Sequence, residues 1–236
     1  MKVLAIVPAR CGSKGFPNKN IMKISDTTLL ELAVNIGVKS NYIDDVYVST
    51  DCIEYEKIAL KAGAKSLGLR PAKLATDSSK SIDVVIDLLQ SIQEEYKYVV
   101  LLQPTSPLRE PDDIKCMIEL MQEKDVDASV SISRLEEPHP YKLKSITHDG
   151  YVESFMKGKT SEVPRQSLPK VYALNGAIYI SKTEVILREK TFLPKKTLPY
   201  IIEENINIDT EIDFLLLKTM YENNKINIFG MKNEKC

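Results

Sequence analysis

The chain has 236 residues, of which 43% are hydrophobic and 28% charged, and its 32 basic and 33 acidic residues leave a net charge of -1. This length and composition predict a soluble globular protein, and the near-neutral charge argues against broad binding to nucleic acid or to a membrane surface. No stretch approaches the roughly 20 apolar residues of a membrane span, and the first apolar run, residues 3–7, is shorter than the core of a signal peptide.

Short apolar runs alternate with amphipathic stretches, which is typical of β-α-β units and predicts an α/β fold with a mostly parallel sheet. The apolar runs set the ends of the predicted strands, and capping signals help to set the ends of the helices. These signals are Asp51 as a possible N-cap, Gly63 as a helix stop and Pro111 in a first turn. We predict strands at residues 2–7, 45–49, 98–103, 128–133 and 172–181, and helices at residues 28–38, 52–62, 81–94, 111–123 and 210–222.

Residues 134–170 interrupt this alternation. They contain four prolines, which flank two short segments, residues 142–146 and 151–155, that are typical of a hairpin-like excursion. The segment has too little apolar surface for a core of its own, so we expect this arm to be covered by a partner.

Four cysteines are scattered through the chain without Cys-x-x-Cys spacing, which indicates neither a zinc site nor a disulfide framework and favours a reducing cytoplasm. The two histidines, His139 and His148, have no spacing to each other or to paired carboxylates that indicates a metal site. We interpret both as surface residues.

The loop after the first predicted strand contains several residues that could bind an anionic ligand. Arg10, Lys14 and Lys19 supply three cations within ten residues, and Gly12 and Gly15 allow the backbone N–H groups to approach a ligand. The spacing is neither that of a Walker loop nor Gly-x-Gly-x-x-Gly. A phosphate site is therefore one interpretation, and a turn with solvated surface cations is the other.

Ligands of open α/β sheets bind beyond the carboxyl ends of the strands, where the loops converge. Three polar loops occupy that position, namely residues 10–20, 49–51 and 103–109. Pro104 and Pro107 fix backbone angles in the third loop and keep it out of a helix. We therefore expect these three loops to form one site.

Two segments carry a resemblance to a known family. Residues 6–20 closely resemble the first signature of the CMP-acylneuraminate synthetases, and residues 102–109 resemble the second. The similarity extends over almost the whole chain, through residues 48–51, 70–72, 164–166, 175–179 and 208–214. It implies a single domain, residues 1–236, with a three-layer, Rossmann-like nucleotidyltransferase fold and a protruding dimerisation arm at residues 134–170.

The resemblance implies transfer of CMP from CTP to the anomeric hydroxyl of a nonulosonic acid, with release of pyrophosphate and a requirement for Mg²⁺. Such a reaction needs fixed cations and N–H donors where the leaving group gains charge. The catalytic residues implied are Arg10, Lys14, Lys19 and Asp209. The nucleotide-binding residues implied are Ala9, Arg10, Gly12, Ser13, Lys14, Asn20, Arg70, Ser79, Ser81 and Gln103. An exposed arginine and a helix N-cap are the ordinary alternatives for Arg70 and Ser81.

The resemblance also implies a homodimer in which the arm delivers sugar-site residues to the partner. The sugar-binding residues that it implies are Gln103, Thr105, Lys142, Arg165, Asn175 and Tyr179. Lys142 and Arg165 have the alternative of being ordinary surface cations. The related Kdo cytidylyltransferases carry an aspartate in the loop that corresponds to residues 103–109, and this chain has none there.

Asp209 has two interpretations, because a lone carboxylate before an apolar helix is often an N-cap. The family pattern there resembles Asp-x-Asp, which implies Asp209 as the principal Mg²⁺ ligand. The first acidic position is Asn207 in this chain, so Asn207 is at most a weak ligand that brings no charge. Asp213 is a reserve candidate, with an exposed helix acid as the alternative.

Cys11 stands where the family commonly has glycine. Three nearby cations would favour its thiolate and make it reactive, whereas the alternative is an inert, half-buried cysteine. Two other functions stay open at this point: a Kdo or sugar-1-phosphate nucleotidyltransferase, and a non-catalytic nucleotide-binding subunit.

Overall fold

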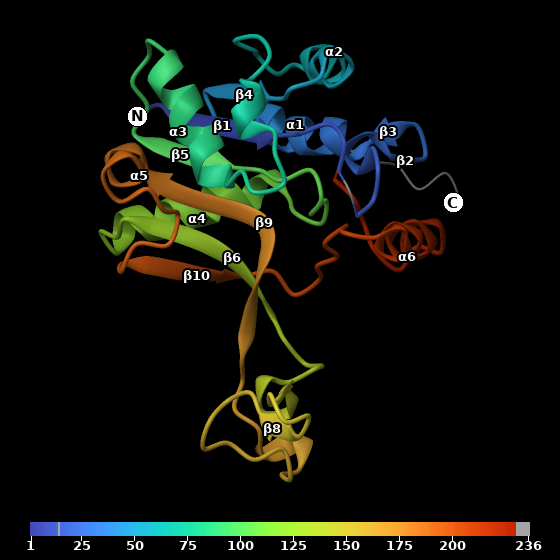
Figure 1. The fold of residues 1–236 in the computed structure, drawn as a ribbon. Helices are drawn as coiled ribbons and strands as arrows, with labels where there is room; N and C mark the ends of the chain where they lie inside the picture. Colours follow the sequence, from blue (N-terminus) through green and yellow to red (C-terminus); the bar gives the residue numbers. More distant parts are fainter. Residues whose placement is uncertain (14, 230–236) are drawn as a thin grey trace.

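A six-stranded sheet forms the centre of the computed structural model, which describes residues 1–13 and 15–229 (Figure 1). The strands lie in the order β10-β6-β9-β5-β1-β4. In chain order the main elements are β1 (Val3–Pro8), α1 (Leu29–Lys39), β4 (Asp45–Ser49), α2 (Ile53–Lys61), α3 (Ser81–Ser91), β5 (Tyr98–Leu101), α4 (Pro111–Glu123), β6 (Ala128–Arg134), β9 (Tyr172–Lys182), α5 (Thr183–Glu189), β10 (Thr197–Ile201) and α6 (Glu211–Glu222).

The sheet is mostly parallel, as predicted. β1 pairs in parallel with β4 and β5, and β10 pairs in parallel with β6. β9 runs antiparallel between β5 and β6, and its register with β6 shifts between Val130 and Ile132. The carboxyl ends of β1, β4 and β5 therefore share one edge of the sheet, where the polar loops were expected to meet.

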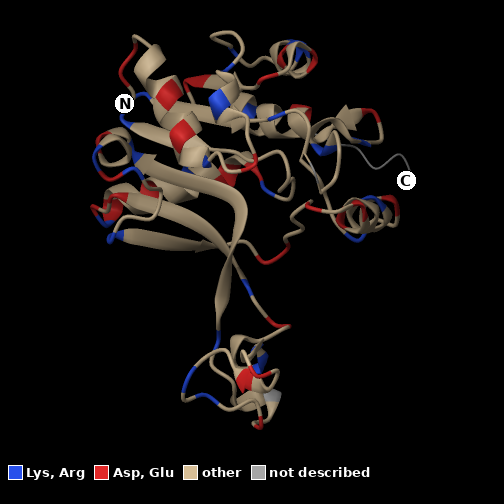
Figure 2. Ribbon diagram, in the orientation of Figure 1, with Lys and Arg blue, Asp and Glu red and all other residues tan. Residues whose placement is uncertain are grey.

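Helices cover both faces of the sheet, so the three-layer prediction is confirmed. Val3, Ala5 and Val7 of β1 belong to one core, together with apolar residues of α1, α2 and α4. Leu4 and Ile6 point the other way and pack with residues of α3 and α5. The strands are almost free of charged residues, which lie on helices and loops instead (Figure 2). Burial on both faces explains the uninterrupted apolar runs.

A separate apolar cluster attaches α6 to the first loop. Phe16 of that loop lies 6.0 Å from Phe214 of α6, measured between ring centroids. The short hairpin of β2 (Lys23–Ile24) and β3 (Thr27–Thr28) adds Ile24, and Leu108 and Leu217 complete the contact. This packing brings the segment before α6 next to the loop after β1.

Each predicted strand and helix has an observed counterpart, with ends that differ by a few residues. β10 and α5 were missed. Pro199 interrupts the strand pattern of β10, which tolerates a proline because it lies at the sheet edge. α5 is only seven residues long, too short for a clear helical period. The cap prediction at Asp51 was wrong: the N-cap of α2 is Cys52, and Asp51 accepts a hydrogen bond from the first loop instead.

The chain leaves the sheet between β6 and β9 and forms the arm (Figure 1). The arm contains η3 (Pro140–Lys142), the antiparallel pair β7 (Lys144–Ile146) and β8 (Val152–Ser154), and η4 (Arg165–Ser167). The predicted hairpin is therefore confirmed. His139, expected at the surface, is buried at the base of the arm and bonds the carbonyl of Pro169.

Within residues 1–13 and 15–229, no helix has the length and apolarity needed to cross a membrane.

Candidate active site

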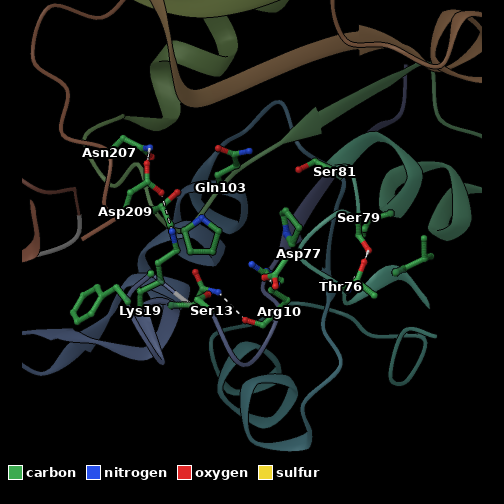
Figure 3. A pocket seen from close by; sticks show the side chains of 18 of the residues that line it. Arg10, Ser13, Lys19, Thr76, Asp77, Ser79, Ser81, Gln103, Asn207 and Asp209 are labelled. Atoms are coloured by element: carbon green, nitrogen blue, oxygen red, sulfur yellow. Dashed lines mark hydrogen bonds and ion pairs between the residues drawn. The ribbon is translucent and has the colours of Figure 1, made fainter. Parts of the chain in front are cut away.

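A cavity of about 680 Å³ opens beyond the carboxyl ends of β1 and β5 (Figure 3). Four separate parts of the chain line it, and most of their side chains are polar or charged. The lining residues are Pro8, Arg10, Ser13, Gly15, Phe16, Lys19, Asn20, Arg70, Leu74, Thr76, Asp77, Ser79, Ser81, Val84, Gln103, Pro104, Thr105, Asn207 and Asp209.

Side chains from outside and within the first loop hold its backbone in place. Asn20, which is buried, donates from Nδ2 to the carbonyl of Arg10 at 3.1 Å, and Asp51 accepts from the N–H of Cys11 at 2.8 Å. Gly12 has a φ of +67°, a left-handed conformation that favours glycine. Ala9 is buried and donates its N–H to Ser49, so it supports the loop from behind the cavity.

Two described cations of the first loop line the cavity, and each is paired with an acid. Arg10 donates to Asp77 at 2.7 Å, and Lys19 donates to Asp209 at 2.9 Å and to the carbonyl of Ile208 at 3.0 Å. Figure 3 shows the two pairs at separate places on the cavity wall. An anionic ligand that reaches Arg10 would compete with Asp77. Lys14 lies outside the described residues.

Arg70 and the loop before α3 form the opposite side of the cavity. The Arg70 side chain is only 6% exposed, and its guanidinium lies 3.7 Å from Asp51. Burial lowers the pKa of Arg70, against the opposing effect of Asp51. Ser79 bonds Thr76 twice, through the Thr76 N–H and hydroxyl, and so closes the turn. Ser81 is the first residue of α3 rather than its N-cap, which is Lys80. Neither ordinary alternative, an exposed arginine or a capping serine, describes these residues.

Residues 103–109, the Gln103 loop, form the floor near β9. Arg109 is buried and donates from one nitrogen to the carbonyls of Gln103 and Ala177, at 2.9 and 2.6 Å. The hydroxyl of Ser106 bonds the carbonyl of Asn175 at 3.1 Å. These bonds fix the Gln103 loop to β9, and the loop in turn accepts the N–H of Ile208 on the Thr105 carbonyl.

Gly176→Ala should disturb this floor. A Cβ at residue 176 would lie 2.8 Å from Gln103 Oε1 and 2.9 Å from Ser106 Oγ, and the residue has a φ of +75°. We expect a loss of about 1–3 kcal/mol in the free energy of unfolding, from crowding and backbone strain. Nucleotide affinity should fall with it, because Gln103 moves. Urea unfolding and calorimetric titration with CTP measure the two effects, and unchanged CTP affinity would contradict the contact.

Asp209 is a cavity residue and not a helix cap. The N-cap of α6 is Thr210, which forms a capping box with Asp213. Burial acts to raise the pKa of Asp213, but hydrogen bonds from Thr210 and Asp209 outweigh this effect, and the pKa is lowered. Asp213 therefore has a structural role. The Asp209 side chain is 65% exposed and accepts from Lys19 on one oxygen and from Asn207 on the other.

The profile of a family described as "Cytidylyltransferase" matches residues 4–226. The chain belongs to this cytidylyltransferase family. It is 37% identical to an N-acylneuraminate cytidylyltransferase of Streptococcus agalactiae over 219 residues, which cover 91% of this chain and 52% of the relative. It is 34% identical to a CMP-N,N'-diacetyllegionaminic acid synthase of Legionella pneumophila over 231 residues, 95% of this chain and 98% of the relative. The chain thus spans about half the length of the streptococcal protein.

A solved structure of a CMP:2-keto-3-deoxy-manno-octonic acid synthetase complexed with CTP superposes with a TM-score of 0.71 at 15% identity. The match covers 95% of this chain and 100% of that one. At this identity the likeness establishes the fold, which is therefore that of a nucleotidyltransferase with a Rossmann-like core.

The structure brings some of the predicted sugar-binding residues to the cavity and leaves others away from it. Gln103 and Thr105 line the cavity. Asn175 does not: it is buried, and its amide bonds Ser131 and Ser133 of β6. Tyr179 packs beside Phe192, with 5.8 Å between ring centroids. Lys142 lies on the arm and pairs with Glu137 at 3.3 Å, and Arg165 begins η4 of the same arm.

The surroundings of Cys11 do not favour its thiolate. Burial and a hydrogen bond with Cys52 raise its pKa, and the neighbouring Asp51 acts in the same direction. Of the two interpretations, these surroundings favour the inert, half-buried cysteine. The sequence places three cations near Cys11, but the fold pairs Arg10 and Lys19 with acids and places a carboxylate beside the thiol.

Sequence reasoning missed Thr76 and Asp77 in the cavity and Ser106 behind it. Thr76 and Asp77 belong to a polar stretch before α3 that carries no motif, and only the fold shows that it faces Arg10. Ser106 belongs to residues 102–109, which were identified from the sequence as a signature segment. The hydrogen bond of Ser106 to β9 was not predicted.

Proposed function

We propose that the protein transfers CMP from CTP to the anomeric hydroxyl of a nonulosonic acid of the acylneuraminate type. One observation carries the proposal: a single cavity joins Arg10 and Lys19 of the cationic loop with Gln103 and Asp209, although these residues come from three distant segments. The two relatives named above are an N-acylneuraminate cytidylyltransferase and a CMP-N,N'-diacetyllegionaminic acid synthase, which supports this class of sugar.

In the proposed reaction the sugar hydroxyl loses its proton to water and its oxygen bonds to the α-phosphorus of CTP, while the bond from that phosphorus to the bridging oxygen breaks and pyrophosphate leaves. Negative charge grows on the leaving group. Arg10 and Lys19 face the cavity as fixed cations and would stabilise that charge. Ser13, Asn20, Arg70, Ser79 and Ser81 lie where they can hold the nucleotide, and Gln103 and Thr105 lie where the sugar would meet it.

We propose Mg²⁺ as the cofactor, with Asp209 as its protein ligand. An exposed carboxylate at the cavity fits a hard cation, because each oxygen keeps a lone pair beyond the bond that it already accepts. The described residues contain no group of three or more His, Cys, Asp or Glu side chains that could hold a metal ion. Nucleotide phosphates and water would complete the shell. The ion would neutralise the charge of the triphosphate.

Pyrophosphate release tests the proposed function. The purified protein is assayed with CTP and Mg²⁺ against N-acetylneuraminate, diacetyllegionaminate, pseudaminate and Kdo, with sugar-free reactions as controls. We expect release with at least one nine-carbon sugar. Release with Kdo alone would favour the other transferase, and CTP binding without release for any sugar would favour a nucleotide-binding subunit. The scattered cysteines favour the cytoplasm as the place of this reaction.

We further propose that the arm packs on a second copy and carries Lys142 and Arg165 toward its sugar site. The hairpin exposes large apolar side chains: Ile146 is 77% exposed, Tyr151 73% and Val152 71%. Lys142 does not line the cavity of its own chain. Contiguous exposed apolar surface of this kind is typical of an interface.

Ile146→Asp should therefore separate the dimer. We expect light scattering to report the mass of one chain instead of two, with pyrophosphate release reduced at least about tenfold and the monomer still folded, because an exposed side chain adds little to its stability. Ile53→Asp on α2, 57% exposed and remote from the arm in Figure 1, is the matched control. A wild-type protein of one chain mass would contradict the proposal.

A further inference from the structure

Asn207 bonds both Ser106 of the Gln103 loop and Asp209, and Figure 3 shows the second of these contacts. Its Oδ1 accepts a hydrogen bond from Ser106 Oγ at 3.0 Å, and its Nδ2 donates to Asp209 Oδ2 at 2.7 Å. An ionised carboxylate only accepts hydrogen bonds, so the amide nitrogen must be the group that faces Asp209. The amide oxygen then faces the hydroxyl. The chemistry of its two neighbours therefore fixes the direction of the Asn207 amide.

Both neighbours of Asn207 are themselves held. Ser106 is fully buried, and its single hydroxyl proton is shared between Asn207 Oδ1 and the carbonyl of Asn175 in β9, so it provides a fixed anchor. Asp209 receives the amine of Lys19 on its other oxygen at 2.9 Å. The carboxylate is thus held from two sides, by a cation from the first loop and by an amide connected to the central sheet.

An acid at residue 207 would behave differently. Two carboxylate oxygens at the 2.7 Å that now separates Nδ2 from Oδ2 would both be acceptors and would both carry negative charge. Such a pair is stable only with a cation or a proton between the oxygens. The amide donates its own N–H into this gap, so no further group is needed there.

We propose that Asn207 is a positioning residue that holds Asp209 toward the cavity without a metal ion, and that the nucleotide-free protein consequently has little affinity for divalent cations. A single carboxylate is a poor site for a hard cation, which takes six or more oxygen ligands. The cation would therefore be held mainly by the phosphates of a bound nucleotide. The catalytic part of this inference rests on the proposed function, whereas the cation-binding part does not.

Cation binding to the nucleotide-free protein tests the second part. Mn²⁺ is titrated by calorimetry into wild type and Asn207→Asp, with no nucleotide or sugar present. We expect a dissociation constant weaker than about 1 mM for wild type. In Asn207→Asp the two carboxylates should bind Mn²⁺ at least about tenfold more tightly, and Mn²⁺ should raise the melting temperature of this variant more than that of wild type.

Asn41→Asp is the matched control, because it adds the same charge at an exposed residue outside the cavity lining and should leave the wild-type constant unchanged. Micromolar binding by nucleotide-free wild type would overturn the inference. So would an Asn207→Asp protein that binds Mn²⁺ no better than Asn41→Asp does.

Asn207→Ala tests the positioning role. Loss of a hydrogen bond to the charged Asp209 should lower kcat about tenfold, with KM for CTP within about twofold of wild type. Its Mn²⁺ affinity should stay as weak as that of wild type. An unchanged kcat would show that Asn207 positions nothing. If wild type releases no pyrophosphate with any sugar, the proposed function fails, and the Mn²⁺ titration still decides the cation-binding part.

Discussion

Arg10→Ala should lower kcat/KM for CTP about 100- to 1000-fold, the usual cost of removing one donor from a developing anion. Its free energy of unfolding should change by less than about 1 kcal/mol, because Arg10 and Asp77 form a partly exposed pair at the cavity wall. Pyrophosphate release gives the first quantity and urea unfolding the second. The large separation between the two effects is what distinguishes a residue that binds substrate charge from one that supports the loop.

The matched control is Arg188→Ala on α5. Arg188 pairs with Glu189 at 2.8 Å, much as Arg10 pairs with Asp77 at 2.7 Å, but it lies outside the cavity lining. The Arg188→Ala substitution should leave both pyrophosphate release and the free energy of unfolding close to those of wild type. If Arg10→Ala loses activity only in proportion to stability, the assignment of Arg10 to the triphosphate is wrong.

Asp209→Asn should lower kcat about 100-fold and raise the Mg²⁺ concentration needed for half-maximal rate. The substitution keeps the size of the side chain and removes the charge opposite Lys19. Stability should change little, because Thr210 and Asp213 cap α6 and Asp209 does not. Initial rates over a range of Mg²⁺ concentrations, with thermal melts of the same samples, measure both effects.

Asp213→Asn is the control, four residues further along the chain. It weakens the capping box and should cost about 1 kcal/mol of stability, while the Mg²⁺ dependence stays that of wild type. The opposite assignment of the two acids would be established if Asp209→Asn melted earlier with normal kinetics and Asp213→Asn altered the Mg²⁺ requirement.

The layers of the fold were predictable because burial on both faces leaves apolar runs in the strands and an amphipathic period in most helices. The order of the strands was not predictable, because no local sequence pattern indicates that β9 lies between β5 and β6. The conformation of Gly176 belongs to the same class. A Cβ at residue 176 would meet the side chains of Gln103 and Ser106, which lie about 70 residues earlier in the chain, so no local pattern shows that only glycine fits there.

The rule that ligands bind beyond the carboxyl ends of parallel strands predicted the position of the site. It did not predict which cation of the site pairs with which acid. Arg10 and Asp77 are 67 residues apart, and Lys19 and Asp209 are 190 apart. A sequence shows that these side chains are charged, but only the fold shows which cation meets which acid. The surroundings of Cys11 could not be predicted for the same reason, because burial and a hydrogen bond with Cys52, 41 residues away, raise its pKa.

The central place of β9 has a consequence for how the chain folds. β5 and β6 both pair with β9, and no strand lies between them until residues 172–182 have been synthesised. During translation each of them therefore presents an open hydrogen-bonding edge to solvent. Closing the sheet joins segments that are about 80 residues apart along the chain, a slow step compared with helix formation. We expect nascent chains that stop before residue 172 to aggregate more readily than the complete chain.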